Sequence, residues 1–416
     1  MICINTYFRF NRILLLSIGL WPYKRTKLVE FQAILILAFL IFCITYLFAT
    51  FAFTKCTPAL VINVLSIALL GIIYAFSYHS FYVNVHTIRW LMYKLQHIYN
   101  DLKDENEIAI VTKYGNIAKR FTAIMMLFEV CCVITILLLT FLLQFLDTTL
   151  LVDKSESRYV MQKVIPKYFI GRESFLYLII PSLFASASIG GTAVVATGMM
   201  FVTYLKHTCG MFRIASYRIE KAMMIKMLKN VNLENEIIIY KEIVHAVDIH
   251  RKAVHFAMLV YSTFKGLLCT VTVVGVICLS CNLYRLSETM SRDGEIEQCY
   301  MHLLITITIF IILFISNSAG QEVTDYNNHV FLTAYKVQWY VAPLHIQRLI
   351  LFILQNGSKT FRPSIIGLFS FSIEIFASVK NNYIYCMLRL TYCTYSTFGT
   401  NSIVQDILFE FTLYSS

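Results

Sequence analysis

Charged side chains are scarce in this chain of 416 residues: Asp, Glu, Lys and Arg together make up 14% of it. A typical soluble domain carries about 25% charged residues, so the composition argues against a soluble multidomain enzyme. Proline and glycine are also few, with 6 and 15 residues, which argues against collagen-like and low-complexity chains. No nucleophile–base pair, metal cluster or phosphate-binding loop stands out, so we expect neither an enzyme nor a metal or cofactor site.

Hydrophobic residues are abundant instead, at 58% of the chain. A helix needs about 20 apolar residues to cross a bilayer. We therefore predict an all-α, polytopic membrane protein, in which Leu14–Trp21 is a short interfacial or re-entrant piece. Seven predicted spans follow that piece, at residues 31–53, 58–83, 121–146, 173–204, 256–284, 299–320 and 363–388.

The distribution of positive charge predicts the orientation of these spans. Of the 35 Lys and Arg residues, 24 fall in the N-terminal segment and in every second loop after it. Because cytoplasmic segments are enriched in Lys and Arg, we expect a cytoplasmic N-terminus and an extracellular C-terminus. This orientation also explains the net charge of +11 without a nucleic-acid partner, and it is opposite to that of a G-protein-coupled receptor.

The expected cytoplasmic segments have an amphipathic helical pattern. Residues 84–116 are predicted to form a helix leaving the membrane, and residues 205–255 and 322–355 extend other spans in the same way. In the first segment Ile88 and Leu91 share one face, and polar residues share the other. A helical cluster below the membrane indicates either assembly between subunits or packing within one chain, and the sequence leaves both readings open.

The last predicted span has a polar stripe at helical spacing. Its members are Glu374, Ser378, Asn381 and Tyr385, and apolar Leu388 follows at the outer end. Such a stripe is costly against lipid, so it should face protein or water. It could line a hydrated pore in a symmetric assembly with a hydrophobic gate at Leu388, or it could form a polar contact between helices of one subunit.

The outer halves of the second, third, fourth and sixth spans are aliphatic with sparse hydroxyl groups. Small residues gather in the fourth span between Ala185 and Gly191. They either allow helices to approach closely or leave room for a small ligand. A pocket here would favour small apolar molecules, because burial of apolar surface contributes about 25 cal/mol per Å².

Five sets of residues, in this order along the chain, resemble one known family. They are Phe10–Arg12 with Gly19–Pro22, then Lys113–Arg120, then His207–Phe212 with Tyr217–Ile219, then Gly320, Gln321, Ala334, Tyr335, Trp339 and Tyr340, and finally Ser370–Glu374 with Phe376 and Val379. In order and spacing the chain is similar to the insect odorant receptor family, particularly to receptors of ants, bees and wasps.

The resemblance implies the odorant-binding subunit of a ligand-gated, nonselective cation channel with an inverted seven-helix topology. It implies a heterotetramer with the shared odorant receptor co-receptor, in the plasma membrane of olfactory sensory neurons. It further implies a small volatile or apolar ligand, a cytoplasmic anchor helix near 342–355, and a pore helix at 363–388 with its gate near Leu388.

The resemblance also places the odorant pocket among the second, third, fourth and sixth spans. The residues that we expect to line it are Leu70, Ile73, Tyr74, Thr135, Leu138, Leu139, Ala187, Gly190, Leu304 and Thr308. We expect the anchor region to contact other subunits through Tyr335, Trp339 and Tyr340.

The predicted organisation has four parts: residues 1–204 with the pocket bundle, 205–362 with the cytoplasmic extensions and the anchor, 363–390 with the pore-lining helix, and 391–416 as an atypical tail. The alternatives are a gustatory-type receptor channel and a seven-helix G-protein-coupled receptor, although Asp-Arg-Tyr and Asn-Pro-x-x-Tyr motifs are not found at their expected places. A secondary transporter would show inverted repeats with broken helices, and none is evident in the sequence.

Overall fold

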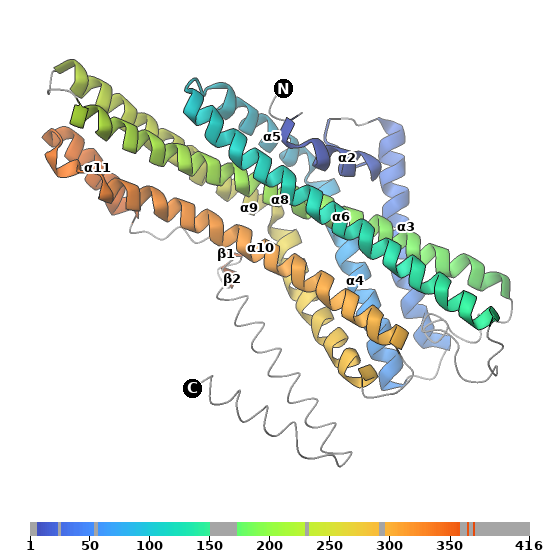
Figure 1. The fold of residues 1–416 in the computed structure, drawn as a ribbon. Helices are drawn as coiled ribbons and strands as arrows, with labels where there is room; N and C mark the ends of the chain where they lie inside the picture. Colours follow the sequence, from blue (N-terminus) through green and yellow to red (C-terminus); the bar gives the residue numbers. More distant parts are fainter. Residues whose placement is uncertain are drawn as a thin grey trace, which may run out of the picture.

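The computed structural model describes residues 6–23, 26–53, 57–149, 173–228, 233–290, 296–357, 364–365 and 369–370. This part of the chain is almost entirely helical, which confirms the predicted all-α fold class (Figure 1). The long helices are α3 (Lys27–Phe53), α4 (Pro58–Val83), α6 (Glu105–Thr149), α8 (Glu173–Leu228), α9 (Leu233–Met290) and α10 (Ile296–Lys336). The shorter ones are α2 (Arg9–Ser17), α5 (Val85–Asn100), the 3-10 turn η2 (Trp339–Val341) and α11 (Leu344–Gly357).

Six helices in the described part of the chain are long and apolar enough to cross a membrane. They contain the first six predicted spans, and α4 matches its predicted bounds to the residue. The start of α4 is well specified, because Thr57 accepts a hydrogen bond from the Leu60 amide at 3.3 Å and Pro58 occupies the first turn.

The seventh predicted span is mostly outside the described residues, and with it the pore residues Glu374, Ser378, Asn381, Tyr385 and Leu388. The described residues at its start are not helical, so the prediction of a helix from residue 363 is wrong there. Strand β1 (Ser364–Ile365) pairs antiparallel with β2 (Phe369–Ser370). Their β-branched and aromatic residues fit an extended backbone better than a first helical turn.

The prediction of one helix over 84–116 is also wrong, although its buried face is right. Helix α5 ends at Asn100 and α6 begins at Glu105, because Asp104 accepts a hydrogen bond from the Asn106 amide at 2.8 Å and starts a new helix. The apolar face is buried as expected, with Ile88, Leu91, Leu95 and Ile98 each at most 5% exposed.

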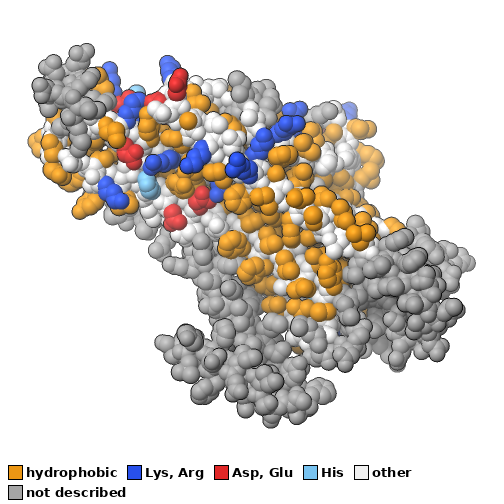
Figure 2. All heavy atoms as spheres, in the orientation of Figure 1, with side chains coloured by type: hydrophobic (Ala, Val, Ile, Leu, Met, Phe, Trp, Pro, Cys, Tyr) orange, Lys and Arg blue, Asp and Glu red, His pale blue; other side chains and the backbone are white. Residues whose placement is uncertain are grey.

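Helix α8 is the centre of the bundle. It packs against α9, α6, α10, α4 and α2, and every residue from 199 to 212 is buried. Helices α8, α9 and α10 run together well beyond the part packed against α4, towards the end where α11 lies (Figure 1). The described charged side chains gather on that end, and the surface towards the other end is hydrophobic (Figure 2). This separation is what a membrane protein with helical extensions outside the bilayer requires.

The N-terminal segment packs onto the bundle. Leu15 and Trp21 are buried, and Gly19 adopts a φ of 72° that allows the chain to turn between them. The Tyr78 hydroxyl donates to the Ile18 carbonyl at 2.8 Å, and Arg89 Nε donates to the Pro22 carbonyl at 2.8 Å. The predicted short apolar piece is therefore fastened to α4 and α5.

Candidate ligand pocket

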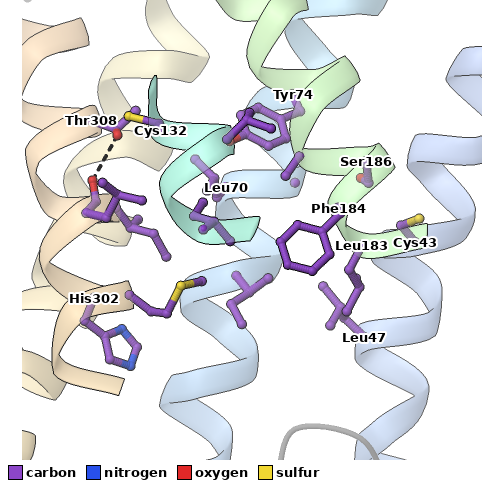
Figure 3. Close-up of a pocket in the computed structure, with 18 of the residues that line it drawn as sticks. Cys43, Leu47, Leu70, Tyr74, Cys132, Leu183, Phe184, Ser186, His302 and Thr308 are labelled. Carbon is purple, nitrogen blue, oxygen red and sulfur yellow. Dashed lines mark hydrogen bonds between the residues drawn. The ribbon is translucent and has the colours of Figure 1, made fainter. Parts of the chain in front are cut away.

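A cavity of about 170 Å³ lies among α3, α4, α6, α8 and α10, in the apolar part of the bundle. By the same measure a single water needs only about 10–15 Å³, so this space is large enough for a small organic molecule. Figure 3 shows Leu70, Phe184 and Leu47 around a common space, with Thr308 and His302 on the α10 side.

The wall is mostly aliphatic, with a few polar groups. Helix α4 contributes Leu70, Gly71 and Tyr74, and α8 contributes Phe184 and Ala187. The polar members of the wall are Asn63, Tyr74, Glu129, Ser186, His302 and Thr308. A cavity with an apolar surface and a few placed polar groups is typical of small-molecule sites.

Five of the ten residues predicted to line a pocket lie in the wall of this cavity. They are Leu70, Tyr74, Ala187, Leu304 and Thr308, which come from α4, α8 and α10. The structure therefore brings together residues from three of the four spans named by the sequence. That they contact a ligand stays a prediction.

Four of the other five, Ile73, Gly190, Thr135 and Leu138, do not line the cavity. Ile73 and Gly190 are buried behind the wall, and the described residues do not include the side chain of Leu139. Thr135 is exposed and donates to the Cys131 carbonyl at 2.6 Å. Leu138 is 63% exposed. Thr135 and Leu138 lie on the face of α6 that is turned away from the cavity.

The residues of α6 that do line the cavity are Glu129, Cys132, Val133 and Ile136. They follow the spacing of one helical face, with steps of three and four residues. An ionisable residue inside a span marks a functional or protein-facing position. Glu129 is therefore the residue in the sequence that could have identified the face of the third span that lines the cavity.

The wall also includes α3, although the predicted pocket did not include the first span. Its contribution is Cys43, Ile44 and Leu47, close to Phe184 of α8. Among the polar residues of the predicted first span, Gln32, Thr45 and Tyr46 do not line the cavity, so the polar residues do not mark the inner face of the span.

Two adjacent glycines of α8 set how closely the wall packs. A methyl group at Gly190 would meet the Tyr74 ring, and it would lie 2.7 Å from Tyr74 Cβ. A methyl group at Gly191 would clash with the carboxyl of Glu129. The Gly190–Gly191 pair therefore allows Tyr74 and Glu129 to lie directly against the α8 backbone.

A buried polar cluster borders the cavity where α9 and α10 meet. Arg285 is 3% exposed, forms an ion pair with Glu288, and donates from Nη2 to Gln298 Oε1 at 2.9 Å. One turn further along α10, His302 lies 2.9 Å from Asn282, measured from Nδ1 to Oδ1. These bonds satisfy polar groups that would otherwise be costly to bury.

The predicted anchor residues lie at the elbow between α10 and α11. Tyr335 and Tyr340 are 68% and 64% exposed, and the Trp339 and Tyr340 rings have centroids 6.4 Å apart. Gln347 of α11 donates to the Tyr340 carbonyl at 2.9 Å and fixes the elbow. Helix α11 corresponds closely to the anchor helix expected near 342–355.

Comparison with known proteins gives matches over most of the chain. A family model described as 7tm Odorant receptor matches residues 57–384. Odorant receptor 46a, isoform B, of Drosophila melanogaster is 28% identical over 159 residues, which cover 36% of this chain and 36% of that protein. The match to this curated relative thus spans about a third of its length.

Two solved structures have a similar fold. The insect olfactory receptor OR5 from Machilis hrabei in complex with eugenol has a TM-score of 0.72 and 14% identity, and the match covers 93% of this chain and 97% of that one. The other structure of OR5 from Machilis hrabei has a TM-score of 0.69 and 12% identity, and the match covers 94% of this chain and 98% of that one.

Proposed function

Since this multi-pass membrane chain belongs to the 7tm odorant receptor family, we propose that it is the odorant-binding subunit of a ligand-gated, nonselective cation channel. The observation that carries the proposal is the cavity of about 170 Å³ among α3, α4, α6, α8 and α10. Its apolar wall suits a small volatile molecule, which gains affinity from burial and shape without an ion pair.

In this proposal, helix α10 links the ligand to the pore. Leu304, Ile305 and Thr308 contact the cavity, and the same helix continues without a break to Lys336. The elbow η2 and helix α11 follow, and then the predicted pore segment at 363–388. A ligand that binds better when α10 takes its open-state position shifts the channel towards opening by that difference in affinity.

The partner in this proposal is the odorant receptor co-receptor, in a heterotetramer. The exposed Tyr335 and Tyr340, with Trp339 between them in the chain, supply the aromatic surface that subunit interfaces favour. The receptor works in the plasma membrane of olfactory sensory neurons with its N-terminus in the cytoplasm. Small aromatic odorants are suitable first ligands, because the receptor of similar fold from Machilis hrabei was solved with eugenol.

The test is expression in oocytes of this chain alone, the co-receptor alone, and both together, with currents recorded across an odorant panel. We expect an odorant-evoked cation current that needs this chain. A variant that ends after Leu390 tests whether residues 391–416 affect the channel. No evoked current from either form, despite surface labelling of the protein, would contradict the proposal.

Topology separates the proposal from a G-protein-coupled receptor. We expect an epitope tag at the N-terminus to be accessible to antibody only after the cells are permeabilised. Labelling of the tag on intact cells would contradict the inverted topology and favour the receptor class that signals through G proteins.

A further inference from the structure

His302 lies in the wall of the cavity and is itself 4% exposed. It comes from α10, at the edge of the cavity that borders the α9–α10 cluster (Figure 3). Most of its neighbours in the wall are apolar, among them Met301 and Ile305. A polar ring in such a wall can decide which ligands are accepted.

The hydrogen bonds of Asn282 fix the orientation of its side-chain amide. Asn282 Nδ2 donates to the Cys278 carbonyl oxygen at 2.8 Å. A carbonyl oxygen only accepts hydrogen bonds, so the amide nitrogen must face Cys278 and the amide oxygen must face His302. Asn282 is fully buried, so the surrounding helices hold this arrangement.

This orientation in turn fixes the tautomer of His302. Asn282 Oδ1 lies 2.9 Å from His302 Nδ1 and can only accept, so Nδ1 carries the hydrogen. The neutral ring then has its lone pair on Nε2. The hydrogen bond at Nδ1 is the one that the described residues give to the side chain of His302, so no described group occupies Nε2.

We infer that His302 is a specificity-determining residue that selects ligands with a hydroxyl group, because its Nε2 accepts a hydrogen bond from them. The inference rests on the proposed function and names the substrate class of the same pocket: alcohols and phenols. Ethers and ketones of the same skeleton offer no donor, and their oxygen would face the Nε2 lone pair. One net hydrogen bond predicts about a fivefold to tenfold preference for the hydroxylated ligand.

The experiment measures binding to the purified chain in lipid nanodiscs, by ligand-induced stabilisation against thermal unfolding. The probes are two matched pairs, hexanol with hexyl methyl ether and eugenol with methyl eugenol. Wild-type protein should bind the hydroxylated member of each pair about fivefold or more tightly. His302→Phe should lose this preference, and His255→Phe is its matched control because His255 is exposed on α9 and does not line the cavity.

Asn282→Asp tests whether Asn282 positions the His302 ring. The measured quantity is the preference for alcohols over ethers, which would stay the same if Asn282 had only a structural role. The carboxylate still accepts from Nδ1 but favours the doubly protonated ring, so Nε2 becomes a donor and the preference should turn towards the ethers. If this variant does not fold, His302→Gln replaces it, since the amide oxygen of Gln can accept from an alcohol and should restore part of the preference.

Equal binding of both members of each pair to wild type, or an unchanged preference in His302→Phe, overturns the inference. Binding of none of the probes to folded protein overturns it as well. The assay needs no current, so it is separable from the channel proposal. A chain that binds alcohols selectively but never opens supports the role of His302 and contradicts the proposed channel function. A channel that opens equally to alcohols and ethers supports the channel function and contradicts the role of His302.

Discussion

The two ends of the α8–α9–α10 bundle are built on different principles. The cavity end contains the wall residues of the pocket, and most of its hydroxyl groups bond within their own helix, as Thr308 does to the Leu304 carbonyl. The extension end contains residues 205–228 of α8, 233–255 of α9 and 321–336 of α10. It is joined to the rest by ion pairs between helices, such as Arg218 with Glu107.

The extension end is also more completely filled. His207 is fully buried, stacks on Phe8 with ring centroids 5.4 Å apart, and lies 2.6 Å from the Tyr99 hydroxyl. Close packing with directed polar contacts specifies one arrangement, whereas a cavity allows its lining to adjust. We therefore expect a ligand to act on the adaptable end, and we expect the extension end to move as a unit.

We expect the largest loss of stability when the ion pair between α6 and α8 is removed. Arg218 Nη2 lies 2.9 Å from Glu107 Oε2, and the Glu107 side chain is only 6% exposed. Arg218→Ala leaves that carboxylate buried without its partner, so we expect a loss of about 3–5 kcal/mol in unfolding free energy. Thermal unfolding of the purified receptor in detergent measures it.

The control for that change is Arg213→Ala, because the side chains of Arg213 and Glu220 are 37% and 36% exposed and the pair is 3.7 Å long. Exposed pairs contribute about 0–1 kcal/mol, so this variant should be close to wild type. Equal losses in the two variants would show that the extension end does not depend on its buried ion pair.

The second test acts on the cavity end through the glycine pair of α8. Gly190→Ala places a methyl group against the ring and Cβ of Tyr74, neither of which can move far without moving α4. We expect a destabilisation of about 1–3 kcal/mol and a weaker odorant response. Gly198→Ala is the matched control, because a methyl group there meets no described atom within 4 Å. The same loss in both variants would contradict a role for close packing at Gly190.

Filling the cavity tests whether its volume is used. Ala187→Leu adds apolar atoms to the wall without introducing a polar group. We expect the odorant concentration for half-maximal current to rise about tenfold, equivalent to about 1.4 kcal/mol, with thermal stability nearly unchanged. Leu138→Ala should leave the current unchanged, because Leu138 is exposed outside the cavity. An effect of Leu138→Ala larger than that of Ala187→Leu would place the ligand elsewhere.

The smallest expected effect is on the stability of the protein in acid, and it comes from the loop between α5 and α6. A hydrogen bond from Lys221 at 2.6 Å lowers the pKa of Asp104 below its ordinary value of 3.8. Because the folded pKa is the lower one, this pair stabilises the protein fully above the ordinary value, and the contribution is lost as pH falls through the lowered value. Unfolding midpoints should therefore fall less steeply below pH 4 for Asp104→Asn than for wild type. Parallel curves would contradict this role.

Much of the fold follows from hydrophobic length and capping residues. The bounds of α4 were predictable because Thr57 and Pro58 mark its start. The break before α6 was missed because a hydrogen bond from a backbone amide to Asp104 overrides a helical pattern that continues across it. A hydrogen bond between a side chain and a nearby backbone amide can be assigned only when the geometry of the loop is known.

The candidate site was predictable only in part, and the reason is helix rotation. Tyr74 and Thr308 were found because hydroxyl groups among aliphatic residues tend to face the interior. Thr135 satisfies the same pattern but bonds to its own helix at the Cys131 carbonyl, so it can face outwards. The part of the wall that comes from α3 depends on how α3 and α4 cross. The polar residues of α3, such as Gln32 and Thr45, do not mark the face that lines the cavity.

The most direct test of the central claim is an experimental structure of the receptor, assembled with its channel partner, in the presence of its strongest activating odorant. We expect ligand density bounded by Tyr74, Phe184 and Thr308, between α4, α8 and α10. Ligand density at another place, with this cavity empty in an activated receptor, would contradict it.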